Sequence, residues 1–478
     1  MHKTLKKKTA KRARFVRLEQ FKSTQKQSIS AKECGKIVLW QIKKILNCHF
    51  SDLRSHLSSL EDPRKGIQYS IEELLMGGIV LFLLNCKSRN EFNLMVKDKC
   101  FSQNYFRMFG LGLSLMDAVN DLFEIMKPEE LQEVRCLLIN ALINKRVFHK
   151  FRFFGNCFCV AIDGTGVYNW GDTPPESILP YALKKEYSKS GKVNYSSQIL
   201  EAVIVCSNGL VVPLMSEWIA NDGLDYDKQD CELKAFKRLS VRLKKCFPRL
   251  KLCILADGLY SNVSMMNLCD EYGWKFTTVF KDGNLPSVWQ EVESLLPLSG
   301  ASHKCQQQIC NRTHWITSDY CWIKNLEYQK YRIHWLECVQ ISKHRQTGEE
   351  TTNRFVFLTN WDVNDKNIFS ILQAGRARWR IEDHFNTQKN RDGALPHKFN
   401  RNNFNAIKNW HNLRQLGCMM REMVKYTSEL KQVKNEIKKM TWKELWKNLN
   451  SLLTMLLIED IITDFENWSK SARQIRLE

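Results

Sequence analysis

Phe158-Cys-Val-Ala-Ile-Asp163 is an apolar run that ends at a carboxylate, and Leu252-Cys-Ile-Leu-Ala-Asp257 repeats the pattern. A short apolar run that is bounded by turn residues predicts a buried strand, here at 156–162 and at 252–256. An aspartate at a strand end also fits a turn or a helix cap, so neither acid alone assigns a function. Together the runs predict a buried sheet with acids at two strand ends.

The elements around these runs predict a mixed α/β layer. Gln198–Cys206 and Leu210–Glu217 flank Ser207-Asn208-Gly209, which is typical of a β-hairpin. Apolar residues at helical spacing predict a helix at 230–245, and Ser261 fits the cap of a helix that ends near Tyr272. With a further strand at 274–280, the order is strand, hairpin, helix, strand, helix, strand.

A third acid follows much later, in Gly375-Arg-Ala-Arg-Trp-Arg-Ile-Glu-Asp-His-Phe-Asn-Thr-Gln-Lys389. We expect one helix over about 367–390, with Trp379 in the core. At roughly 100° per residue, Arg378, Glu382 and Lys389 fall within about 40° of one another, on one helix face. A base, an acid and a base on one face suit a phosphate group beside a metal ion. Simple ion pairing within the helix is the alternative.

Asp163, Asp257 and Glu382 are the acids that a two-metal phosphoryl-transfer site requires. Mg²⁺ prefers carboxylates and water, and it takes few protein ligands, so three converging acids suffice. We expect Asp163 to bridge two ions, Mg²⁺ or Mn²⁺, while Asp257 and Glu382 each bind one. The chain contains no phosphate-binding loop of the P-loop kind and no evident Ser-His-Asp set, so neither ATP hydrolysis nor serine hydrolase chemistry is indicated.

The composition indicates a nucleic-acid partner. The formal net charge of the 478-residue chain is +21 and the pI is about 9.3, which favours a polyanion. The longest apolar run, Leu74–Leu84, is too short to cross a bilayer. The basic N-terminus lacks the apolar segment of a secretory signal, and the 17 cysteines are scattered. We expect free thiols and a cytoplasmic, nucleoid-associated protein without membrane contact.

The changes of pattern along the chain predict six segments. The first has seven Lys/Arg within residues 1–14 and reads as a DNA-contacting arm, or simply as a solubilising tail. The segments are a basic arm (1–28), a helical DNA-binding region (29–150), the first part of a catalytic core (151–282), a β-rich insertion (283–360), the last part of the core with the Glu382 helix (361–400) and C-terminal helices (401–478).

These residues resemble the DDE transposases of bacterial insertion sequences, in the group that has a YREK signature and a β-strand insertion before the last acid. Asp163 matches the first family acid in Ile162-Asp-Gly-Thr, Asp257 the second in Leu255-Ala-Asp-Gly-Leu-Tyr260, and Glu382 the third. Arg378, Glu382 and Lys389 satisfy the signature spacing. The resemblance covers about 155–415 well, and it also includes Asp230–Leu239 and Lys281-Asp-Gly283.

The resemblance implies an RNase H-like core, Mg²⁺-dependent cleavage of the ends of a mobile element, and joining of 3′-hydroxyls to target DNA. It also implies a homodimer in the synaptic complex, with Arg378 and Lys389 bound to DNA phosphates. Gly375 occupies the position of the signature tyrosine, which puts one phosphate contact in doubt. The alternatives are a metal-dependent nuclease without strand transfer and a non-catalytic DNA-binding protein derived from a transposase.

Two weaker patterns lie in the predicted insertion. Trp315, Trp322 and Trp335 are candidates for stacking a flipped base, although core packing of such tryptophans is commoner. A second pattern invites a zinc site, but its spacing is not a standard one. Its residues are His303, Cys305, Cys310 and His314.

Overall fold

The protein is described here by a computed structural model over residues 31–155, 157–187, 191–220, 228–298, 300–437, 440–462, 475 and 477–478. The predicted arm at 1–28 lies outside the described residues. Within the described residues the chain is a mixed α/β protein that has a ten-stranded sheet and helices from both ends of the chain. Here no helix is both long enough and apolar enough to cross a membrane.

The expected helices before residue 150 are confirmed. Ser70 begins one of them with a capping box, in which its hydroxyl accepts from the Glu73 N–H and the Glu73 carboxylate accepts from the Ser70 N–H. The helix that follows is apolar and almost entirely buried. The bounds are α2 (Ala31–His49), α3 (Leu53–Ser58), α4 (Ile71–Leu83), α5 (Arg89–Lys97), α6 (Lys99–Phe109), α7 (Met116–Ile125) and α8 (Pro128–Asn144), and the 3₁₀ turn η1 (His149–Phe151) follows.

Parallel strands form the middle of the sheet. β1 (Phe158–Gly171) runs parallel to β5 (Leu252–Ala256), which runs parallel to β6 (Lys275–Val279). All five residues of β5 are buried, as expected of an apolar strand with neighbours on both edges. The predicted hairpin is confirmed: β3 (Lys192–Val205) pairs antiparallel with β1 and with β4 (Val211–Trp218). A short strand, β2 (Leu183–Tyr187), follows η2 (Glu176–Tyr181) and pairs with the first half of β3.

Helices cover both faces of this part of the sheet. On β4, Ser216 bonds His411 of α14 (Phe404–Lys425), whereas Glu217 pairs with Arg238 of α9 (Lys228–Cys246). Successive strand residues point to opposite faces, so α14 and α9 lie on different sides of β4. After β5, the 3₁₀ turn η3 (Gly258–Tyr260) leads into α10 (Val263–Tyr272).

The expected cap of α10 is off by one residue. Asn262 caps this helix, with its side chain accepting from the Met265 N–H. Ser261 instead donates to Thr278 of β6 over 2.8 Å. Its hydroxyl is therefore used to tie η3 to the neighbouring strand.

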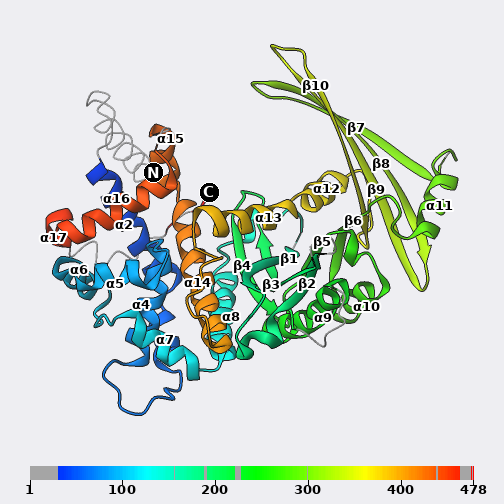
Figure 1. Ribbon diagram of the computed structural model, residues 1–478. Coiled ribbons are helices and arrows are strands. Elements are labelled where there is room, and N and C mark those ends of the chain that lie inside the picture. The colour runs from blue at the N-terminus through cyan, green and yellow to red at the C-terminus, as the bar shows by residue number, and fades with distance from the viewer. Residues whose placement is uncertain are drawn as a thin grey trace, which may run out of the picture.

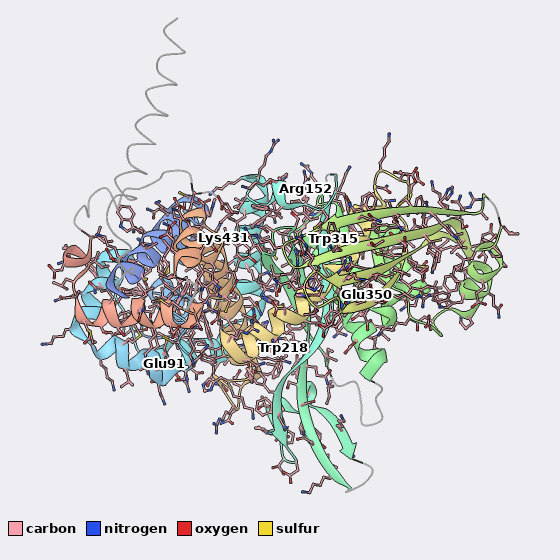
Figure 2. All side chains as sticks on the ribbon, turned by 90° about the horizontal axis from the view of Figure 1, so that it is seen from above. Glu91, Arg152, Trp218, Trp315, Glu350 and Lys431 are labelled. Atoms are coloured by element: carbon pink, nitrogen blue, oxygen red, sulfur yellow. The ribbon has the colours of Figure 1, made fainter. Side chains whose placement is uncertain are left out.

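The insertion extends the sheet instead of forming a separate barrel or sandwich. β10 (Glu350–Thr359) pairs antiparallel with β6 and with β9 (Tyr331–His344), and β8 (His314–Tyr328) and β7 (Ser302–Cys310) complete the edge. Long strands project from the body in Figure 1. The predicted β-rich insertion also contains a helix, α11 (Pro286–Leu295), which precedes the strands. Seen from above, Trp315 and Glu350 lie on this insertion, while the ends of β1, β2 and β3 project separately (Figure 2).

The expected single helix over 367–390 is wrong in detail. α12 (Ile368–Arg376) and α13 (Trp379–Asn386) are separated by a short turn, and a π-helical turn η4 (Thr387–Arg391) follows. At the break the backbone changes to i→i+3 bonds, such as Arg378 N–H to Gly375 O at 3.2 Å. Glycine is a weak helix former, and the break begins two residues after Gly375, at Ala377.

Most of α14 is buried, and it contacts α4, α7 and α8, so it joins the N-terminal helices to the sheet. Figure 1 shows the N-terminal helices and α14–α17 gathered at one end of the sheet and the insertion at the other. The remaining helices are α15 (Ser428–Glu436), α16 (Trp442–Met455) and α17 (Ile458–Ile461).

Candidate active site

Asp257 directly follows β5, whereas Asp163 lies within β1, which continues to Gly171 and does not end at residue 162 as predicted. The pairing of β1 with β5 ends at Ala161 opposite Leu255, and β1 then continues, paired with β3, through Asp163. Asp257 follows β5 directly and caps η3, accepting the Leu259 N–H at 2.9 Å. Crevices outside the carboxyl ends of parallel strands are where open α/β sheets bind ligands. The topology therefore places both predicted acids at one such edge.

Arg378 contacts both Glu382 and Asp163, the third and the first of the predicted acids. Its guanidinium donates to the Glu382 carboxylate over 2.6 Å and lies 3.7 Å from a carboxylate oxygen of Asp163. The Arg378 side chain is only 9% exposed, whereas those of Asp163 and Glu382 are 25% and 36% exposed. A buried cation between two part-exposed acids thus fixes α13 against β1. We call Asp163, Asp257 and Glu382 the acidic edge.

The electrostatics of Asp163 show that the three acids are close enough to interact. Burial raises the pKa of Asp163 to about 6, and the Glu382 and Asp257 carboxylates add to the increase. The Arg378 guanidinium and the Gly164 N–H act in the opposite direction. A like charge disfavours a second negative charge nearby, so a cation that enters this edge would be favoured.

Lys389 reaches the same edge from the π-helical turn. Its ammonium donates to the Thr165 hydroxyl over 2.6 Å, two residues along β1 from Asp163. Burial lowers the pKa of Lys389. The alternative for both cations was an ion pair with Glu382 within the helix. Arg378 forms this pair, whereas Lys389 contacts Thr165 of β1 instead.

A buried chain of polar side chains holds the π-helical turn. Gln388 lies 2.9 Å from His384 and donates to Gln415 of α14 over 3.0 Å. Gln415 in turn donates over 3.1 Å to Glu201, which is the register partner of Asp163 on β3. These bonds connect the turn that carries Lys389 to the strand beside the first acid. Sequence periodicity does not reveal them, because each residue comes from a different element.

The carboxylates of the acidic edge have cations as their partners. Lys281 lies 3.8 Å from Asp257, in addition to the contacts of Arg378. Among the described residues, no three His, Cys, Asp or Glu side chains are gathered tightly enough to hold a metal ion as they stand. The same finding leaves the zinc pattern of the insertion without support, and its His303 stacks on Trp322 with ring centroids 5.4 Å apart.

Two further residues approach the site. A Cβ atom on Gly164 would lie 2.9 Å from an Oε of Glu232 on α9, so this carboxylate is packed against the residue after Asp163. The Tyr260 hydroxyl is buried and has no hydrogen-bond partner among the described residues. Burial raises the pKa of Tyr260, and the carboxylates of Glu232, Asp163 and Asp257 raise it further. Both residues lie in segments that the family resemblance includes, but neither residue carries a local sequence signal for a role.

The structure gives a packing reason for the glycine at position 375. Gly375 is buried in α12, and a Cβ atom there would lie 2.8 Å from the Phe357 ring of β10. A tyrosine could enter only if Phe357 moved. The packing of the insertion against α12 therefore requires a small residue at this position.

The tryptophans divide between core and surface. Trp322 and Trp335 are each 1% exposed and belong to the core, whereas Trp315 is 53% exposed. The expectation that Trp379 is a core residue is wrong: it is 63% exposed, and the Arg378 guanidinium carbon lies 5.5 Å from its ring centroid. It begins α13 on the side away from Ile381, which packs into the core.

No protein-family model matches this chain, and no curated protein matches it with significant similarity.

Proposed function

We propose that this protein is a transposase that cleaves the ends of a mobile element and joins their 3′-hydroxyls to target DNA. The observation that carries the proposal is the convergence of Asp163, Asp257 and Glu382 at one sheet edge. Each comes from a separate segment of the chain. The strand order β4-β3-β1-β5-β6, with β1, β5 and β6 parallel, supports an RNase H-like core.

The three carboxylates of the acidic edge are part-exposed oxygen ligands, which is the ligand type that a hard divalent cation prefers. Mg²⁺ or Mn²⁺, as two ions held by Asp163, Asp257 and Glu382, would supply an activated water or 3′-hydroxyl and a stabilised leaving oxygen. In the structure Arg378 and Lys281 provide the counter-charge for these acids. Cation binding would release both side chains for other partners.

The chain's own cations then have a clear role. Arg378 offers a planar fork of donors and Lys389 a point charge, and both suit the oxygens of a phosphodiester. Lys389 donates to Thr165, which holds its ammonium close to Asp163 on the same strand. In cleavage a water oxygen bonds to phosphorus and the P–O3′ bond breaks. In joining, the 3′-hydroxyl replaces water in the same type of displacement.

The net charge of +21 supports double-stranded DNA as the partner, both as element ends and as target. A homodimer in the synaptic complex is part of the same proposal. The two alternatives, a nuclease without strand transfer and a non-catalytic DNA-binding derivative, are separate outcomes of one experiment.

The experiment is cleavage and joining of duplex DNA that carries the sequences flanking the gene. Wild type and Glu382→Gln are compared in Mg²⁺ and in EDTA. Cutting at a defined end that requires Mg²⁺ and Glu382, followed by joining, supports the transposase. Cutting without joining supports the nuclease. Binding without cutting supports the DNA-binding derivative, and equal cutting by Glu382→Gln would show that the assigned acids are wrong.

A further inference from the structure

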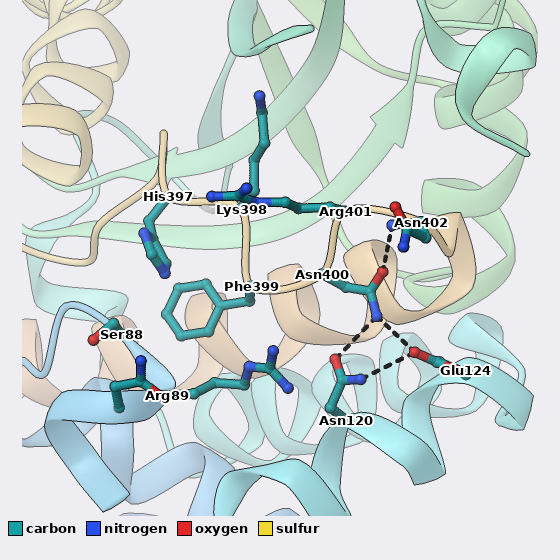
Figure 3. A pocket seen from close by; sticks show the side chains of 11 residues that line it. Ser88, Arg89, Asn120, Glu124, His397, Lys398, Phe399, Asn400, Arg401 and Asn402 are labelled. Atoms are coloured by element: carbon teal, nitrogen blue, oxygen red, sulfur yellow. Dashed lines mark hydrogen bonds between the residues drawn. The ribbon is translucent and has the colours of Figure 1, made fainter. Parts of the chain in front are cut away.

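A cavity of about 480 Å³ lies apart from the acidic edge, between the start of α5, α7 and the connection from η4 to α14. Figure 3 shows Arg89, His397, Phe399 and Arg401 around it, with Asn120 and Glu124 at one end. We call it the basic cavity. Its residues come from three elements that are far apart in the sequence, so no single motif encodes it.

The lining of the basic cavity carries more positive than negative charge. Arg89, Lys398 and Arg401 line it, and Glu124 is the one acid among its lining residues. Glu124 is already engaged, because one oxygen accepts from Asn120 at 3.0 Å and from Asn400 at 2.8 Å (Figure 3). Three cationic side chains therefore face one acid, and the lining keeps a net positive charge.

A buried guanidinium behind the cavity adds to this charge. Arg414 is 0% exposed and lies between Phe82 and Phe399, 5.4 Å from each ring centroid. Both of its terminal nitrogens lack a hydrogen-bond partner among the described residues, and only its Nε donates, to the Gly393 carbonyl. A buried charge without a counter-charge is costly, so an anion nearby would compensate it.

The pKa of His397 is affected by several of these cations together. Partial burial lowers the pKa of His397, and the guanidinium groups of Arg414, Arg401 and Arg89 lower it further. Three cations therefore act on one imidazole at the cavity wall. An anion bound among them would meet a positive potential from several sides.

The N-terminus of α5 points to the same ligand. Ser88 caps this nine-residue helix and lines the cavity with Arg89, the first helical residue. A helix N-terminus favours anions, and here its first turn already holds the Glu91 carboxylate, which accepts the Lys87 N–H. Asp117, which lies 3.2 Å from Arg89, is 63% exposed, and exposed pairs of this kind contribute little. Arg89 can therefore change partners at little cost.

We propose that the basic cavity binds a phosphate group, with a backbone phosphate of DNA as the ligand. The DNA part of this inference rests on the proposed function, whereas phosphate binding itself does not. Lys398 at the rim donates to the Asn169 carbonyl of β1, the strand that carries Asp163. Six residues of strand span about 20 Å, or roughly six base pairs of rise, so one duplex could reach both places.

The first test measures thermal unfolding in inorganic pyrophosphate against chloride at matched ionic strength. The variants are Arg401→Gln, at an exposed rim position, and Arg89→Gln. The control is Arg249→Gln, an exposed arginine between α9 and β5, at the sheet edge opposite the acids. We expect pyrophosphate to stabilise wild type and the control but neither cavity variant. Equal stabilisation of all four proteins, or of none, would overturn the proposal.

The second test measures DNA affinity against salt concentration for the same proteins, without cleavage. Losing one phosphate contact should reduce the slope of log K against log salt by about 1 in each cavity variant and leave the control unchanged. Pyrophosphate binding with an unchanged slope would assign the cavity to a free phosphorylated molecule and overturn the DNA part. Neither test requires catalysis, so both can be interpreted even if the protein does not cleave DNA.

Discussion

The acidic edge and the basic cavity are both clusters of like charge, but they differ in how their charge is balanced. At the acidic edge, Arg378 and Lys281 pair with the three acids. In the basic cavity, Glu124 is held by two amides, and behind the cavity Arg414 is buried without a carboxylate partner among the described residues. The first cluster is poised to exchange partners and the second to gain one. This difference underlies the two proposals, metal-ion chemistry at the acidic edge and anion binding in the basic cavity.

The largest effect should follow from breaking the acidic edge. Asp257→Asn removes a charge at the end of β5, and we expect cleavage to fall at least about 100-fold, as for loss of one charged group at a reacting centre. The control is Asp270→Asn, an exposed acid on α10. Single-turnover cleavage at saturating DNA measures both. Equal activity of the two variants would remove Asp257 from the site.

Two glycines on β1 offer a matched pair for the geometry of the acidic edge. Gly164→Ala places a Cβ atom 2.9 Å from Glu232, whereas a Cβ on Gly166 meets nothing within 4 Å. We expect Gly164→Ala to reduce cleavage roughly 10–100-fold through displaced groups, and Gly166→Ala to leave it unchanged. Thermal unfolding of both variants checks that the fold persists. A similar loss in both would show that Glu232 packing is irrelevant.

The raised pKa of Asp163 predicts the sign of a stability change. The folded state binds the Asp163 proton more tightly than the unfolded chain does. The free energy of unfolding therefore falls as the pH rises from about 4 to about 6, and it stays lowered above pH 6. In EDTA at pH 7, Asp163→Asn should therefore stabilise the protein by roughly 1–3 kcal/mol.

Urea unfolding at pH 7 and at pH 4 measures this change. The gain should be present at pH 7 and shrink toward pH 4, where the unfolded carboxyl is itself about half protonated. Asp270→Asn is the control for removal of an exposed charge. A gain for Asp163→Asn that is equal at the two pH values would contradict the assigned cause.

The smallest effect concerns the basic arm, which lies outside the described residues. Deleting residues 2–14 should weaken DNA binding by about 10-fold at physiological salt and flatten the salt dependence, because phosphate contacts release counterions. The same titration with Arg401→Gln compares the arm with the basic cavity. An unchanged slope after the deletion would show that the arm does not contact DNA.

Much of the sheet could be predicted because its signals are local. β5 coincides with the predicted 252–256, and the hairpin of β3 and β4 follows from Ser207-Asn208-Gly209. Parallel strands end at a common edge, so two strand-end aspartates could be expected to meet. The pairing of Arg378 with Glu382 also follows from helical spacing.

The remaining features depend on contacts between distant segments. The break after Gly375 and the π-helical turn at Lys389 were missed, because helical spacing alone predicts a regular helix. The exposure of Trp379 depends on where the break turns α13. The approach of Glu232 to Gly164 depends on the packing of α9.

The sequence alone determined the central strands of the sheet, many of the helices, the acids that follow two apolar runs and the positive charge, since these depend on residue type and short-range spacing. Tertiary structure decided which charges meet. It placed Arg378 between Asp163 and Glu382, Lys389 on Thr165, and Arg414 behind the basic cavity. The physical reason is that electrostatic partners are chosen by distance in space, and chain folding sets that distance.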